Sequence, residues 1–111
     1  MFNNTSNFSQ FFFISSILID TSVVDVNVVK TVNLYSQYTA QFNVTNTAMR
    51  SSGAPAQIPV LPTATDLYYY VTYSDSTSIT ITGIDANGIM SYKVIGNTNS
   101  LSFVNIVFVI K

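Results

Sequence analysis

Hydrophobic and polar residues alternate between positions 24 and 44, and this pattern constrains the fold of the chain more than any other feature of its sequence. Because the side chains of a strand point alternately to its two faces, a period of two predicts strands with one buried and one solvated face. We therefore expect strands over residues 22–34 and 38–45, or one long bent strand, with a bulge at Lys30. The apolar set occupies even positions: Val24, Val26, Val28, Val32, Leu34, Tyr38, Ala40, Phe42 and Val44.

The rest of the chain also has the pattern of short strands separated by turns. Residues that favour strands, β-branched or aromatic, dominate residues 67–73, 78–82, 89–95 and 101–110. The segment at positions 85–88, Asp-Ala-Asn-Gly, predicts a hairpin turn, since Asn-Gly tolerates a positive φ. Residues 101–110 are apolar on both faces, which is typical of a central strand covered on both sides or of a strand buried against another subunit.

Residues 50–65 contain three prolines and a glycine, which exclude a central strand. We expect an extended surface loop there, with a short edge strand over residues 57–61 as an alternative. A loop of this length is often functional, but we favour its interpretation as a crossover between two sheets.

The N-terminal segment, residues 1–20, contains the apolar run FFFISSILI at positions 11–19. We expect a strand rather than a short helical turn, either as an apolar arm that packs on a neighbour or as the first strand of the domain. The first cation is Lys30, so no conventional signal peptide is expected, and nine residues are too few for a transmembrane span.

These patterns predict an all-β fold, a single antiparallel β-sandwich that is jelly-roll-like with about seven to eight strands. The chain has 111 residues, the size of one domain, so residues 21–111 are expected to form the β-sandwich domain.

Charged residues make up only 8% of the chain, whereas 42 of its 111 residues are Ser, Thr, Asn or Gln. The few cations are scattered and outnumbered by five Asp residues, so no nucleic-acid partner is expected. The net charge of -1 gives weak repulsion between copies, which favours association.

His, Glu and Cys are absent, which removes the commonest general bases, nucleophiles and metal ligands. A catalytic pair would need two of the five Asp residues, but Asp75 and Asp85 fall in predicted turns and Asp25 on the solvated face of a strand. The start of a calcium loop at Asp85 is not completed, since Gly96 occupies the twelfth position. We therefore expect no enzyme activity, no cofactor and no metal site.

Four tyrosines in one predicted strand form the most suggestive cluster in the sequence. A period of two places Tyr69 and Tyr73 on one face and Tyr68 and Tyr70 on the other, so one pair is expected to point outward. Outward tyrosines can stack on a sugar or anchor a protein, although packing across the sheet is the simpler interpretation. The candidate ligand-facing aromatics are Tyr68, Tyr69, Tyr70 and Tyr73.

We expect a non-catalytic structural subunit of a larger assembly, either a virion component (capsid, penton or decoration) or a subunit of a cell-surface appendage. Its partners would be copies of itself and other structural proteins of the assembly. The alternative is a carbohydrate-binding or adhesin module with a glycan ligand. The candidate assembly contacts are Phe11, Phe12, Phe13, Ile17, Leu18, Phe103, Val107 and Val109.

Overall fold

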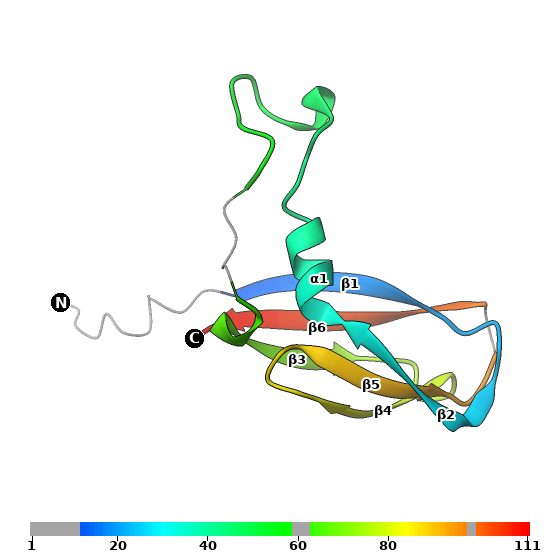
Figure 1. Ribbon diagram of the computed structural model, residues 1–111. Helices are drawn as coiled ribbons and strands as arrows, with labels where there is room; N and C mark the ends of the chain where they lie inside the picture. Colours follow the sequence, from blue (N-terminus) through cyan, green and yellow to red (C-terminus); the bar gives the residue numbers. More distant parts are fainter. Residues whose placement is uncertain (1–11, 59–62, 98–99) are drawn as a thin grey trace.

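A computed structural model describes residues 12–58, 63–97 and 100–111, which are mostly β (Figure 1). The described residues contain six strands: β1 (Phe12–Asp20), β2 (Asp25–Asn33), β3 (Leu67–Tyr73), β4 (Ile79–Ile84), β5 (Ile89–Val94) and β6 (Leu101–Ile110). They also contain the helix α1 (Leu34–Ala40) and the 3-10 turns η2 (Thr47–Met49) and η3 (Ala64–Asp66). The predicted all-β class is confirmed, with fewer strands in these residues than expected.

The strands form two antiparallel sheets, ordered β1-β6-β3 and β2-β5-β4. β6 is central in the first sheet, as in one of the two alternatives predicted for it, but Leu101 and Phe103 on one of its faces are exposed. β5 is central in the second sheet. The strand predicted in the N-terminal segment is also confirmed, because β1 pairs along its length with β6, from Phe12 opposite Val109 to Asp20 opposite Leu101.

One hydrophobic core draws side chains from both sheets and from α1. Its buried members are Ile17, Ile19, Leu34, Tyr38, Leu67, Ile79, Met90, Tyr92, Val94, Val104, Ile106 and Phe108. The two central strands each contribute three of them at alternate positions, as expected for strands with one buried face. One face of the first sheet therefore packs against the core, and the opposite face of this sheet points away from the core.

Helix α1 takes the place of residues 38–40 of the strand that was predicted over residues 38–45, and the rest of that strand is reduced to an isolated bridge at Asn43. The Asn33 side chain accepts a hydrogen bond from the Ser36 backbone N–H at 3.0 Å and so caps the N-terminus of the helix. Leu34 and Tyr38 are buried, one helical turn apart. Positions 34, 38 and 42 are separated by four residues, a spacing that fits both a period of two and one face of a helix. The strand prediction was wrong because the two periods coincide here.

The buried even face predicted for the valines before Lys30 is also wrong. Asp25 pairs with Val94 and Lys30 pairs with Tyr92, so β2 advances five positions while β5 advances two. The expected irregularity next to Lys30 is confirmed, but it is larger than a one-residue bulge. It leaves the valines of this segment exposed, namely Val24, Val26, Val28 and Val29.

The segment after α1 stands away from both sheets as an extended loop (Figure 1). Its base is closed by two backbone hydrogen bonds of 2.8 Å, from Val44 N–H to Ala56 O and from Ile58 N–H to Phe42 O. The predicted surface loop is thus confirmed for residues 50–58. Of the edge strand considered over residues 57–61, only an isolated bridge at Gln57 is formed, and residues 59–61 lie outside the described part of the chain.

The hairpin turn predicted at residues 85–88 connects β4 and β5. One carboxylate oxygen of Asp85 accepts the backbone N–H groups of Asn87 and Ile89, at 2.9 and 3.0 Å. Gly88 alone in this turn has a positive φ, of 80°. The turn therefore depends on local hydrogen bonds of Asp85 and on the backbone freedom of one glycine.

Candidate functional site: the outer face of the first sheet

The side of the β1-β6-β3 sheet that points away from the core is covered by large apolar side chains. We call it the outer face. In β1, the inward residues Ile17 and Ile19 are buried, and the residues between and around them are exposed. Eight large side chains on this face are each between 47% and 69% exposed: Phe12, Ile14, Leu18, Tyr68, Tyr70, Tyr73, Leu101 and Phe103. Exposed apolar residues usually occur singly, so a whole sheet face of them is unusual.

Strand pairing orders these side chains into rows across the sheet. The row in the middle of the outer face contains Ser16 of β1 and Asn105 of β6, whose side chains are polar. Ser16 Oγ donates a hydrogen bond of 2.6 Å to Asn105 Oδ1. Apolar rows lie on both sides of this row. In the order β1, β6 and β3, the rows are Phe12/Val109/Tyr68, Ile14/Val107/Tyr70, Ser16/Asn105/Tyr73, Leu18/Phe103 and Asp20/Leu101.

Tyr73 lies on the outer face because β3 has a bulge after Val71. Val71 pairs with Ile106 and Tyr73 with the next residue of β6, Asn105. The extra residue turns Tyr73 to the side opposite to that predicted from a strict period of two. Its ring stacks on Phe103, with centroids 5.3 Å apart and planes at 28°. One of the two pairs was expected to point outward, and the structure shows that this pair is Tyr68 and Tyr70.

The two ends of the outer face carry opposite charges. Asp20 ends β1, and its Oδ1 accepts hydrogen bonds from the Ser22 hydroxyl at 2.6 Å and from the Ser22 backbone N–H at 2.9 Å. These bonds, with a smaller contribution from Lys30, lower the pKa of Asp20. At the other end, the Lys111 Nζ atom lies 4.8 Å from the centroid of the Tyr68 ring, in a cation–π contact.

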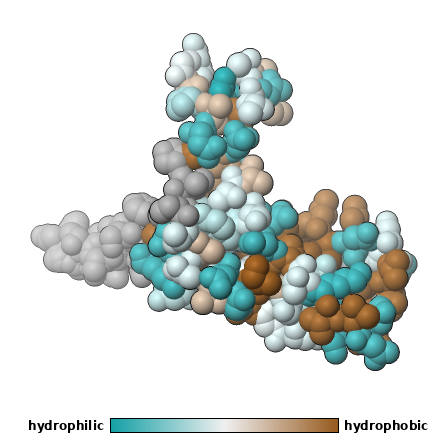
Figure 2. All heavy atoms as spheres, viewed as in Figure 1, coloured by the Kyte–Doolittle hydropathy of each residue, from teal (hydrophilic) through white to brown (hydrophobic). Residues whose placement is uncertain are grey.

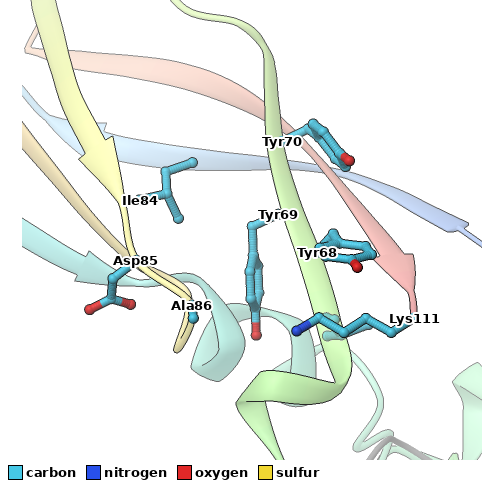
Figure 3. A pocket seen from close by; sticks show the side chains of 8 residues that line it. Tyr68, Tyr69, Tyr70, Ile84, Asp85, Ala86 and Lys111 are labelled. Atoms are coloured by element: carbon cyan, nitrogen blue, oxygen red, sulfur yellow. The ribbon is translucent and has the colours of Figure 1, made fainter.

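A cleft of about 250 Å³ lies beside β3, between this strand and the β4–β5 turn. Figure 3 shows Tyr68 and Tyr70 on one side of β3 and Tyr69 on the other. The Tyr69 hydroxyl donates a hydrogen bond of 2.6 Å to the Ala64 carbonyl, and burial raises the pKa of Tyr69 to about 12. The lining of the cleft combines aromatic rings with one carboxylate and one ammonium group. The lining residues are Leu67, Tyr68, Tyr69, Tyr70, Ile84, Asp85, Ala86 and Lys111.

A second apolar region lies at the turn between β1 and β2 and along β2. In the view of Figure 2, hydrophobic residues gather around β2, whereas the loop after α1 is mostly hydrophilic or intermediate. The exposed members of this valine region are Val23, Val24, Val26, Val28 and Val29.

The residues predicted as assembly contacts fall into three groups. Phe12, Leu18 and Phe103 are exposed on the outer face, and Val107 and Val109 lie half-buried in its rows. Phe13 points to the other side, with its ring 5.9 Å from Tyr38 and 5.4 Å from Phe42, and Ile17 lies in the core of the chain itself. Phe11 lies outside the described residues.

Ile14 and Leu101 also belong to the outer face and were missed by the sequence analysis. The period of two that starts at Phe12 could have found Ile14, because positions 12, 14 and 18 share one side of a strand.

Each of the five Asp carboxylates accepts a backbone N–H from its own turn or strand end. The donors are Ser22 for Asp20, Asn27 for Asp25, Thr63 for Asp66, Thr77 for Asp75, and Asn87 and Ile89 for Asp85. Within the described residues, no three His, Cys, Asp or Glu side chains gather as metal ligands. No helix in the described part of the chain has the length and apolar character needed to span a membrane.

Comparison of the chain with protein-family models, with curated proteins and with solved structures found no match.

Proposed function

We propose that this chain is a non-catalytic structural subunit of a larger assembly, and that the outer face is buried there against another protein chain. The observation that carries this proposal is the set of eight large side chains on the outer face, each of which is between 47% and 69% exposed. At about 100 Å² of exposed surface each, they amount to about 800 Å². The largest apolar patch of an ordinary monomer covers about 300 to 600 Å², so this face is larger than a free surface needs to be.

The pairing of the strands supports a jelly-roll-like β-sandwich, which is part of the proposal. Among the strands of the described residues, the first pairs with the last, β1 with β6, and the second with the second to last, β2 with β5. Such nested pairing across two sheets is the pattern of a jelly roll, a fold of viral capsid and lectin domains. Within the structural class, we propose a virion component or a subunit of a cell-surface appendage. The low content of charged residues favours close packing with neighbours of the same kind.

The native mass of the full chain, measured by light scattering over a range of concentrations, tests this proposal. Ile14→Glu and Leu18→Glu place a charge on the outer face without touching the core, and we expect both to abolish association. The matched control is Val29→Glu, which changes a residue that is 53% exposed in the valine region. A chain that stays monomeric at every concentration, or that associates equally well with Glu at position 14, would contradict the proposal.

A carbohydrate-binding or adhesin function is the second candidate, and the cleft beside β3 favours it. Tyr68 and Tyr70 present exposed rings, and Asp85 and Lys111 lie in the same lining as polar groups that a sugar could meet. Titration with mono- and oligosaccharides, followed by tyrosine fluorescence, tests it against the variant Tyr70→Ala. Binding that is lost in this variant would support the second candidate, and the absence of binding to the whole set would contradict it.

A further inference from the structure

We propose that the partner of the outer face is a second copy of this chain, turned end for end about a twofold axis that runs across the strands. This inference rests on the proposed function, in which the outer face is an assembly surface. It adds the identity of the partner and the orientation of the two copies.

The charges at the two ends of the outer face are the first observation. Asp20 stands in the row of Leu101, and Lys111 Nζ lies over Tyr68, in the row at the opposite end. A copy turned end for end keeps β1 opposite β1, so Asp20 of each chain faces the row of Phe12 and Tyr68 in the other, the row over which Lys111 lies, twice in each dimer. An axis along the strands would instead bring like charges together, which is unfavourable at an interface.

The order of the rows is the second observation. Turning a copy end for end about the middle row sets the row of Ser16 and Asn105 against itself, and the apolar row of Ile14 against the apolar row of Leu18 on both sides. An Asn side chain carries two N–H donors beside its acceptor oxygen, so the middle rows of two copies can hydrogen-bond to each other. This is the self-complementarity that a twofold interface between identical chains requires.

The size of the face is the third observation. The exposed surface of the eight side chains, about 800 Å², matches the total surface that each partner buries in a stable interface of standard size. The net charge of -1 leaves little general repulsion between two copies.

Sedimentation equilibrium of the full chain, with charges exchanged at the two ends, tests the arrangement. We expect a monomer–dimer equilibrium in the original chain. Asp20→Lys alone or Lys111→Asp alone replaces two attractions by two repulsions in each dimer, and we expect the dimer Kd to rise about tenfold. The double variant restores both pairs with reversed polarity, so its Kd should return to within about threefold of the original value.

The matched controls make the same changes of charge on the other sheet, as Asp25→Lys and Lys93→Asp, and should leave the Kd unchanged. Because Asp20 also accepts two hydrogen bonds from Ser22, the thermal unfolding of each variant is measured alongside. If Asp20→Lys fails to fold, the single variant Lys111→Asp tests the contact alone.

Two failures can be told apart. Association that Ile14→Glu abolishes, but that forms a larger oligomer or ignores the exchanged charges, would overturn the end-for-end dimer and leave the proposed function standing. A chain that is monomeric throughout would overturn both.

Discussion

Gly88 packs directly against the ring of Tyr69, so closely that a Cβ atom at position 88 would lie 2.6 Å from Tyr69 Cζ. Gly88 also has a φ of 80°, a backbone angle that residues with a side chain rarely adopt. We expect Gly88→Ala to lower the free energy of unfolding by about 2 to 4 kcal/mol, measured by chemical denaturation. Gly53→Ala is the matched control, because Gly53 has a φ of 83° but no neighbour within 4 Å. Equal losses in the two variants would show that the Tyr69 contact contributes nothing.

Gly96 is required by a different contact, with backbone rather than with a side chain. A Cβ atom at position 96 would overlap the carbonyl oxygen of Thr77, next to the hydrogen bond from Gly96 N–H to Ser78 O. We expect Gly96→Ala to cost about 1 to 3 kcal/mol of stability. Gly83→Ala, at a position with nothing within 4 Å, should change the stability by about 0.5 kcal/mol or less. Thermal denaturation of both variants checks this, and an unchanged melting temperature for Gly96→Ala would refute it.

Tyr69 should make the fold sensitive to alkaline pH. Burial raises its pKa to about 12 in the folded chain, whereas the ordinary value is 10.0. The folded state favours the neutral phenol, so the neutral Tyr69 side chain stabilises the fold. This stabilisation is complete below pH 10 and is lost as the pH rises toward 12. We expect Tyr69→Phe to be less stable by about 1 kcal/mol at neutral pH, through loss of the hydrogen bond to Ala64 O.

Comparing the stability of the original chain with that of the Tyr69→Phe variant across alkaline pH tests the role of Tyr69. The stability difference between them should shrink between pH 10 and 12, as followed by urea unfolding at each pH. A difference that stays constant over this range would count against the raised pKa.

Asp20 should make the stability of the fold depend on pH in the acid range, where stability is lost as the pH falls rather than as it rises. Hydrogen bonds from Ser22 lower its pKa from the ordinary value of 3.8, so the folded state favours the carboxylate. This contribution is present above pH 3.8 and is lost as the pH falls through the lowered folded-state value. Asp20→Asn retains an acceptor oxygen but cannot titrate. We expect the unfolding midpoints of the two chains, measured at low protein concentration, to converge as the pH falls below 4, and parallel curves would contradict the assignment.

Local turn chemistry and strand alternation predicted a large part of the fold. Residues 101–110 form β6 with the predicted bounds, and Asp85 and Gly88 supply the turn expected of them. The errors arose where one pattern fits two structures. Leu34 and Tyr38 satisfy the period of a strand and of a helix alike. The hydrogen bond that caps the helix is accepted by the side chain of Asn33, a residue outside that pattern.

The outer face could be predicted only in part, because β1 is apolar on both sides. Phe12 and Leu18 were expected at an interface together with Ile17, yet Ile17 faces the core. Period two separates these sides but does not tell which one is inward when both are apolar. The outward turn of Tyr73 depends on a bulge that no local residue pattern announces. Likewise, the opposition of Asp20 and Lys111 follows from strand pairing between residues far apart in the chain.

Hydroxyl-radical footprinting of the full chain at two concentrations tests most directly whether the outer face is buried by a partner. In dilute solution, Tyr70 and Phe103 should be labelled, as should Met49, which is 75% exposed on η2. In concentrated solution, we expect Tyr70 and Phe103 to lose labelling, whereas Met49 and Val29 keep theirs. Labelling of the outer face that is the same at both concentrations, or protection confined to the valine region around Val29, would contradict the proposed interface.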